Sequence, residues 1–196
     1  MLFLVRHGQT DANARGLLQG HVDLPLSARG RDQAAALAAL VPDGARVVSS
    51  PLRRARETAA AFGRPVDVDA RWIELDYGEL DGVPVTDVPP DTWRSWRQDP
   101  RFTPPGGESL AALGVRVRDA CGALVPEIRD HDVVVVSHVS PIKAALAWAL
   151  GVGDEVAWRM YVQVGSLARV TVNEWGPSLH SFNEVPAVAP ASTAPR

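Results

Sequence analysis

The chain has 196 residues, of which 46% are hydrophobic and 22% are charged, a balance typical of one globular domain with a sizeable core. Its formal net charge of −3 argues against a nucleic-acid-binding surface, which would carry a basic excess. The apolar start at 1–5 is too short for a signal sequence and no apolar run approaches a membrane span, so we expect a cytoplasmic protein with no membrane partner.

Short apolar runs alternate with helical patterns in the first third of the chain. The first run ends at Arg6-His7-Gly8, which predicts a strand and its exit. Ser27 and Ser50 stand where helix caps are expected, and Pro51 follows Ser50 at the first helical position. In chain order we expect a strand at 2–5, a helix from 27 to about 41, a strand at 46–49, a helix from 50 to about 62 and a strand at 66–68.

The middle of the chain, 76–107, is rich in glycine and proline, and we interpret it as a long excursion with one short helix. Beyond it we expect a long helix capped by Ser109, a strand at 132–136 buried on both faces, a helix at 141–150 and closing strands at 162–172 and 179–182. Strands that alternate with helices in this way predict an α/β fold with a largely parallel sheet.

The sequence also predicts how the chain is divided. We expect a single domain at 1–185 and a disordered tail at 186–196, where Pro, Ala, Ser and Thr follow one another without periodicity. Cys121 is the only cysteine, so it cannot form an internal disulfide, and a reducing compartment fits best. It falls on the apolar stripe of the long helix, which favours a core position over a nucleophilic role.

Two predicted strands end in histidine. The first leads into Arg6-His7, and the all-valine strand leads into Ser137-His138. In a parallel α/β sheet, ligands bind outside the carboxyl ends of the strands, so His7 and His138 meet if their strands are neighbours. Arg54, near the start of a predicted helix, comes to the same edge. Two imidazoles and two guanidiniums form a site for a tetrahedral dianion, and a neutral histidine is a competent nucleophile toward phosphorus.

Five motifs in order resemble those of the histidine phosphatase superfamily, in its phosphoglycerate-mutase-like branch. The first is Leu-Val-Arg-His-Gly-Gln-Thr at 4–10, with Asn13 six residues after His7. The others are Ser-Ser-Pro-Leu-Arg-Arg-Ala-Arg-Glu-Thr-Ala at 49–59, Glu-Leu-Asp-Tyr-Gly-Glu-Leu-Asp-Gly at 74–82, Pro-Gly-Gly-Glu-Ser at 105–109 and Val-Ser-His at 136–138. The resemblance spans roughly 2–182 and implies a three-layer α/β/α sandwich with a mostly parallel central sheet.

The resemblance implies a role for each matching residue. His7 would carry the phosphoryl group, and Arg6, Arg54 and His138 would hold its oxygens. Glu74 would protonate the leaving oxygen and then deprotonate the attacking water. The substrate phosphate would also contact Asn13, Gln19 and Gly20. The resemblance further implies that no metal and no other cofactor is needed.

Two residues depart from the family pattern. Gln9 stands where many members have glutamate, which leaves the chemistry intact because that residue is not the acid. Val139 follows His138 where glycine is usual, a variant that is similar to α-ribazole phosphatases. A displaced backbone at Val139 would put the role of His138 in doubt.

Several side chains also have plainer interpretations. His7 without its flanking residues would be read as a structural histidine at a strand end. Arg54 belongs to a basic run of which we expect Arg53 and Arg56 to be exposed. From the residues alone the acid could be any of four carboxylates, namely Glu74, Asp76, Glu79 and Asp81, and only the motif selects Glu74. Metal-ligand spacing is absent from the remaining histidines, His21, His131 and His180, which we expect in surface or loop positions. The sequence leaves open whether Trp93 and Trp96 pack or line a substrate mouth.

The function expected from these motifs is hydrolysis of small phosphate monoesters through a phosphohistidine. A phosphoglycerate mutase shares that intermediate and is the alternative, although the chain lacks the extra length of typical mutases. A catalytically silent binding domain would have lost one of the five catalytic residues, and none is lost. We expect a small phosphorylated substrate as the partner, no nucleic acid, and a homodimer on general frequency alone.

Overall fold

A computed structural model describes residues 1–188. Six strands form one sheet in the order β3-β2-β4-β1-β5-β6. Their bounds are Leu2–Arg6 for β1, Arg46–Ser49 for β2, Val66–Val68 for β3, Val133–Ser137 for β4, Leu167–Asn173 for β5 and Gly176–Glu184 for β6. Strands β3, β2, β4 and β1 pair in parallel, whereas β5 and β6 join as an antiparallel edge. The predicted mostly parallel sheet is confirmed.

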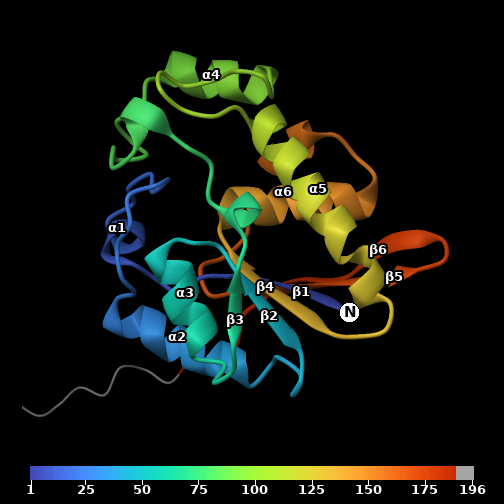
Figure 1. Ribbon diagram of the computed structural model, residues 1–196. Helices are drawn as coiled ribbons and strands as arrows, with labels where there is room; N and C mark the ends of the chain where they lie inside the picture. Colours follow the sequence, from blue (N-terminus) through green and yellow to red (C-terminus); the bar gives the residue numbers. More distant parts are fainter. Residues whose placement is uncertain (189–196) are drawn as a thin grey trace, which may run out of the picture.

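Helices cover both faces of this sheet, with α2 and α3 on one side and α5 and α6 on the other (Figure 1). The α-helices are α1 at Asp11–Ala14, α2 at Ala28–Ala38, α3 at Arg53–Ala60, α4 at Pro90–Gln98, α5 at Leu110–Ile128 and α6 at Val139–Leu150. Short 3-10 helices lie at Ala70–Trp72 (η1), Gly78–Leu80 (η2) and Asp154–Arg159 (η3). The three-layer sandwich expected from the motifs is therefore present. No helix in the described part of the chain is long and apolar enough to cross a membrane.

Successive side chains of each central strand point to opposite faces of the sheet, so the core has one part on each face. In β1, Leu2 and Leu4 pack with α5 and α6, while Phe3 and Val5 pack with α2 and α3. Every residue of β4 is buried, as its unbroken valine run predicts. Burying a side chain of this size stabilises the fold by about 1.5–3 kcal/mol, so the central strands are firmly fixed. The catalytic candidates leave the sheet from these same strands.

Two helix starts differ from the prediction. The helix expected from Ser50 begins at Arg53, and Ser50 is not its cap. The backbone N–H of Ser50 still donates to Val136 in β4, and the Ser50 hydroxyl accepts from Leu52, so 50–52 form a turn. Helix α6 begins at Val139, two residues earlier than expected, with His138 as its N-cap residue.

Other bounds differ as well. Helix α2 stops at Ala38, short of the expected 41. Strand β5 starts at Leu167, because Gly165 has a φ of 68° and turns the segment before it across the end of β1. Of the tail expected at 186–196, residues 186–188 have no regular secondary structure, and 189–196 lie outside the described residues.

The excursion at 76–107 contains α4 as its one α-helix, as predicted, and also η2. Backbone hydrogen bonds from Glu79 to Pro105 and from Glu108 to Asp76 join its two ends. Trp96 is 1% exposed and belongs to the same hydrophobic cluster as Leu2 of the central sheet. In Figure 1 the excursion, with α4, lies beyond the carboxyl ends of the parallel strands.

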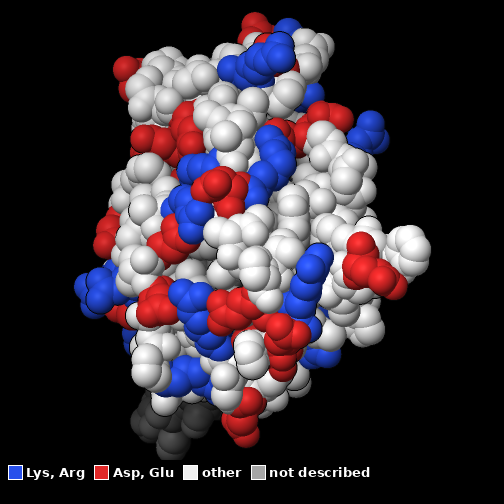
Figure 2. Space-filling model, turned by 45° about the vertical axis from the view of Figure 1, so that its right-hand side comes forward, with Lys and Arg blue, Asp and Glu red and all other residues white. Residues whose placement is uncertain are grey.

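Charged side chains on the surface are mixed in sign. On the face in Figure 2, basic and acidic side chains lie side by side. Pairs such as Arg71 with Asp119 and Arg94 with Asp91 are exposed to solvent. Such pairs contribute at most about 1 kcal/mol each, so the fold depends mainly on its apolar core.

Close packing of two glycines fixes the loop after β1 against the start of α2. A Cβ atom on Gly30 would overlap the carbonyl oxygen of Gln9, and one on Gly8 would overlap the carbonyl oxygen of Gly30. Gly122, in the exposed middle of α5, has nothing within 4 Å of the equivalent position.

We expect Gly30→Ala to destabilise the protein by about 1–3 kcal/mol, because the loop must move. Gly122→Ala should stabilise it by about 0.5–1 kcal/mol through higher helix propensity. Urea unfolding of the two variants measures both effects. Equal stability of the two variants would contradict the close packing.

Candidate active site

His7 and His138 meet at the carboxyl edge of the sheet, as predicted. Arg6 is opposite Ser137 in the parallel pairing of β1 with β4, so the next residue of each strand leaves the sheet at the same level. The two imidazole centroids are 5.1 Å apart, and the rings are tilted by 59°. Both side chains are buried, with His7 3% exposed and His138 0%. The edge of the sheet therefore holds two histidines shielded from bulk water.

One hydrogen bond fixes the tautomer of His7. Its Nδ1 is 2.7 Å from the carbonyl oxygen of Gly8. Because a carbonyl can only accept, Nδ1 must carry the proton, and Nε2 of the neutral ring keeps its lone pair. Burial lowers the pKa of His7 well below its usual value, and the positive charges of Arg54 and Arg6 lower it further. His7 is therefore neutral at neutral pH, and the lone pair of Nε2 is free.

His138 has the opposite tautomer. Nε of Arg54 donates to its Nδ1 at 3.2 Å, so Nε2 carries the proton and donates to the Ser50 hydroxyl at 2.7 Å. Burial, followed by the charge of Arg54, lowers the pKa of His138 well below its usual value. Ser50, expected to be a helix cap, is instead a member of the site. The position of Ser50 directly after β2, at the carboxyl edge of the sheet, is the feature of the sequence that could have identified it as a site residue.

Two guanidiniums supply the positive charge, one from the buried Arg54 and one from the partly buried Arg6. Arg54 is 0% exposed, and its Nη atoms donate to the carbonyl oxygens of Val22, Gln19 and Gly20. Nη1 of Arg6 donates to the Val162 carbonyl at 2.6 Å, while its buried Nε has no hydrogen-bond partner. Burial lowers the pKa of each guanidinium, and the nearby Glu74 opposes that shift. Arginine nevertheless keeps its proton in proteins, so both side chains present fixed charges.

Of the three predicted substrate-binding residues, Gln19 and Gly20 lie in the loop that contacts Arg54, and Asn13 lies in α1. Asn13 forms a capping box with Thr10 at the start of α1, in which Asn13 Oδ1 accepts from the Thr10 N–H. The Gln19 side chain accepts from the Thr10 hydroxyl at 2.6 Å. Gly20 N–H donates to Asp81, which also accepts from the Val22 N–H. Asp81, one of the four acids left open, therefore shapes this turn.

Glu74 is the buried member of the four acidic candidates, at 2% exposed. Its Oε1 accepts from the Leu75 N–H at 2.7 Å and from the Ser140 N–H, in the first turn of α6, at 3.2 Å. Asp76 accepts from the Gly78 N–H, and Glu79 is exposed. Only Glu74 has its carboxylate held at the amino terminus of α6, next to His138.

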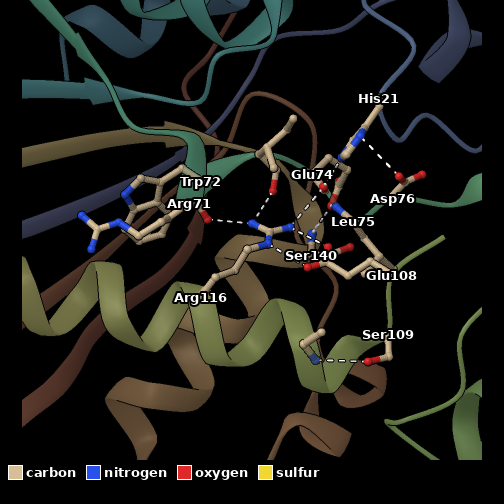
Figure 3. Close-up of polar contacts among 12 residues, drawn as sticks. His21, Arg71, Trp72, Glu74, Leu75, Asp76, Glu108, Ser109, Arg116 and Ser140 are labelled. Atoms are coloured by element: carbon tan, nitrogen blue, oxygen red, sulfur yellow. Dashed lines mark hydrogen bonds and ion pairs between the residues drawn. The ribbon is translucent and has the colours of Figure 1, made fainter.

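Arg116 of α5 fixes the backbone that carries Glu74 (Figure 3). It donates to the carbonyl oxygens of Arg71, Ile73 and Glu74 at 2.6, 2.8 and 3.2 Å. Glu108 in turn holds Arg116 through two hydrogen bonds of 2.9 and 2.8 Å. Nothing in the sequence marks Arg116, because contacts with backbone carbonyls leave no spacing pattern.

His21 also contacts this segment. It was expected in a surface or loop position, and 38% of its side chain is exposed. Its Nε2 lies 3.0 Å from the Glu74 carbonyl, and its Nδ1 lies 3.5 Å from Asp76 (Figure 3). A carbonyl accepts, so Nε2 donates. His21 therefore lies at the surface and also supports the loop of the acid.

The other residues considered in the sequence lie in the expected positions. Arg53 and Arg56 are exposed, as predicted, and so are His131 and His180. Cys121 is buried in the core, as predicted, and burial raises its pKa. Within 1–188, no group of three or more His, Cys, Asp or Glu side chains is arranged to hold a metal ion.

Val139 does not distort the backbone at His138. It is the first residue of α6, a regular helix of 12 residues, and His138 has the extended backbone usual for an N-cap. The first N–H groups of a helix have no partner within the helix and favour anions. Arg54, which donates to Nδ1 of His138, adds a fixed positive charge at this terminus, a setting that suits an anion.

Comparison with known proteins shows the family of the chain. Residues 2–185 match the model of the histidine phosphatase superfamily, branch 1. The chain belongs to this superfamily. It is 37% identical over 177 residues to a bifunctional protein of Mycobacterium tuberculosis, an alignment that covers 85% of this chain and 49% of that protein. The chain thus spans about half the length of such curated relatives.

Solved structures of phosphatases resemble the fold closely. A mycobacterial glucosyl-3-phosphoglycerate phosphatase in complex with VO3 has a TM-score of 0.84 and 31% identity, covering 93% of this chain and 98% of that one. The α-ribazole phosphatase of Shigella flexneri has a TM-score of 0.81 and 28% identity, covering 96% and 99%. The resemblance to the histidine phosphatase superfamily that the five motifs indicated is confirmed.

The lowered pKa of His7 predicts how stability depends on pH. Between about pH 6.5 and the lower pKa of the folded state, the unfolded chain binds a proton at this ring that the folded chain does not. The free energy of unfolding should therefore fall as the pH falls through this window. His7→Gln should make that fall shallower by up to about 1.4 kcal/mol per pH unit.

Urea unfolding at several pH values between 7.5 and 5.5 measures this effect. His131→Gln, at an exposed histidine, is the matched control and should leave the slope unchanged. A slope that is the same in the wild type and His7→Gln would mean that His7 titrates normally in the folded protein.

Proposed function

We propose that this chain is a phosphatase that hydrolyses small phosphate monoesters through a phosphohistidine on His7 and needs no metal. One observation carries the proposal: the Gly8 carbonyl holds the proton of a buried His7 on Nδ1, which leaves Nε2 free to attack. The guanidiniums of Arg54 and Arg6 lie near enough to that ring to lower its pKa, and they would compensate the charge of the phosphoryl group. Phosphoryl transfer requires mainly such placement and charge compensation.

In the first step, Nε2 of His7 attacks phosphorus, and an N–P bond forms as the P–O bond of the ester breaks. Glu74 gives its proton to the leaving oxygen, so that an alcohol departs and not an alkoxide. Arg6, Arg54 and His138 would hold the three equatorial oxygens, with support from Asn13, Gln19 and Gly20. In the second step, Glu74 takes a proton from water, whose oxygen attacks phosphorus. The N–P bond breaks, and inorganic phosphate and neutral His7 remain.

The relatives support the same activity class. The neighbours in structure are named for two phosphatase activities, and one was solved with VO3, an oxoanion. Their names differ in substrate, so they support phosphate-ester hydrolysis without supplying a substrate for this chain. A mutase would use the same phosphoenzyme and differ only in passing the phosphoryl group to a second hydroxyl. A silent binding domain is disfavoured, because all five catalytic candidates are present and lie together.

We also propose that the enzyme is cytoplasmic. It acts on a small phosphorylated molecule and not on nucleic acid or a membrane. A homodimer stays a prediction from general frequency.

The test is hydrolysis of 4-nitrophenyl phosphate by the purified chain in excess EDTA. We expect turnover in chelator and a loss of about 10³-fold or more in His7→Ala, since the nucleophile is removed. His131→Ala removes an exposed histidine and should change the rate less than about twofold. Activity that survives in His7→Ala, or that disappears in EDTA and returns with a metal, would contradict the proposal.

A wild type that hydrolyses no aryl phosphate would next be assayed with 2,3-bisphosphoglycerate and 3-phosphoglycerate. Phosphoryl exchange between these two would assign the chain to the mutase alternative. Absence of both the hydrolysis and the exchange would favour the silent domain.

A further inference from the structure

A small cavity lies beside the proposed catalytic residues. Its volume is about 100 Å³, and Trp93, Trp96, Trp158 and Tyr77 form much of its wall. This answers the question that the sequence left open, because the two tryptophans of the excursion both pack on each other and line a cavity. The polar side of the cavity is formed by α6, through Ser140 and Lys143. Ser140 is the residue whose N–H holds Glu74, so the cavity adjoins the proposed acid.

Lys143 is an unusual member of this wall. It is the only lysine of the chain and is partly buried. Among the described residues it forms no salt bridge and no hydrogen bond, whereas many of the arginines are paired. Burial lowers its pKa, while the charge of Glu74 raises it and that of Arg6 lowers it, so its ammonium lies within electrostatic reach of the proposed acid and of a phosphate-binding guanidinium. A half-buried cation without a partner is costly unless an anion joins it.

The helix sets the spacing between the phosphate site and this cation. Lys143 follows Val139 by four residues and Ser140 by three, so all three lie on one face of α6. One helical turn rises about 5.4 Å, which places Lys143 one turn beyond the helix terminus that faces the phosphate. An anion bound by Lys143 would therefore be only a few bonds from the ester oxygen of the same substrate.

We propose that Lys143 and the aromatic cavity bind the leaving group of the substrate, an inference that rests on the proposed function. The substrates are then phosphate monoesters of small hydroxy acids with an apolar body. Lys143 is the one charged side chain in the wall of this cavity, so its single positive charge balances a carboxylate, whereas a second phosphate dianion would need more than one cation. The cavity is smaller than the roughly 150 Å³ that holds benzene, so it suits a short aliphatic chain. The carboxylate pairs with Lys143, and the apolar part contacts the tryptophans.

A different role for Lys143 would be to balance the charge of Glu74. That role would affect every substrate equally, whether or not it carries a carboxylate. A comparison of an acid with its isosteric neutral amide therefore separates the two roles.

The first experiment measures binding without chemistry. The ligands are 2-hydroxy-4-methylpentanoate, which is the alcohol product of such an ester, and its amide, followed by tryptophan fluorescence. We expect the wild type to bind the acid at least about tenfold more tightly than the amide. Lys143→Met should lose this preference, Lys143→Arg should retain part of it, and Arg56→Met, which removes an exposed charge from α3, should not change it. Equal binding of acid and amide by the wild type, or a preference that persists in Lys143→Met, would overturn the proposal.

The second experiment compares hydrolysis of the phosphate esters of the same acid and amide. Lys143→Met should lower kcat/KM for the acid ester about tenfold or more, mainly through KM, and leave the amide ester within about twofold. An equal loss for both esters would overturn the carboxylate role. Selective binding of the acid with no hydrolysis of either ester or of 4-nitrophenyl phosphate would contradict the proposed function and support the subsite. Turnover of the aryl phosphate with no preference for the acid would support the proposed function and contradict the subsite.

Discussion

Because β1 and β4 pair in parallel, His7 and His138 leave the sheet at the same edge and at the same level. Both strands are buried in apolar clusters on both faces of the sheet, and their parallel ladder runs in register from Leu2 opposite Val133 to Arg6 opposite Ser137. The other parts of the site follow from the same edge. Arg54 arrives from the helix after β2, and Glu74 arrives from the segment after β3. The core therefore positions the chemistry.

Burial also sets the electrostatic state of the site. It lowers the pKa of both histidines, which stay neutral, while the two guanidiniums keep their charge. A neutral nucleophile beside fixed positive charge is suited to a phosphate dianion, since the nucleophile need not lose a proton first. Such an arrangement lowers stability when no anion is bound, because like charges and buried polar groups are held together. The carbonyl contacts of Arg54 and the contacts between Arg116 and the Glu74 loop keep it in place.

Sequence predicted the elements with the strongest local signals and missed those that depend on distant partners. The valine run of β4 and the capped stripe of α5 appear as expected, since burial and capping are encoded locally. Ser50 was interpreted as a cap, because its partner His138 is 88 residues away. Arg116 gave no signal, because it contacts backbone carbonyls whose positions depend on the fold. Lys143 matters only because folding places it beside aromatic residues of the excursion.

The central claim is that Nε2 of His7 forms the bond to phosphorus, and trapping the phosphoenzyme tests it most directly. Wild-type chain and Glu74→Gln, which should slow hydrolysis of the intermediate, would be quenched in alkali during turnover and digested. ³¹P NMR then distinguishes the two phosphohistidine isomers. We predict phosphate on the peptide containing His7, at Nε2, since Nδ1 is bound to the Gly8 carbonyl. Phosphate at Nδ1, on His138, or on no histidine despite continued turnover would contradict the claim.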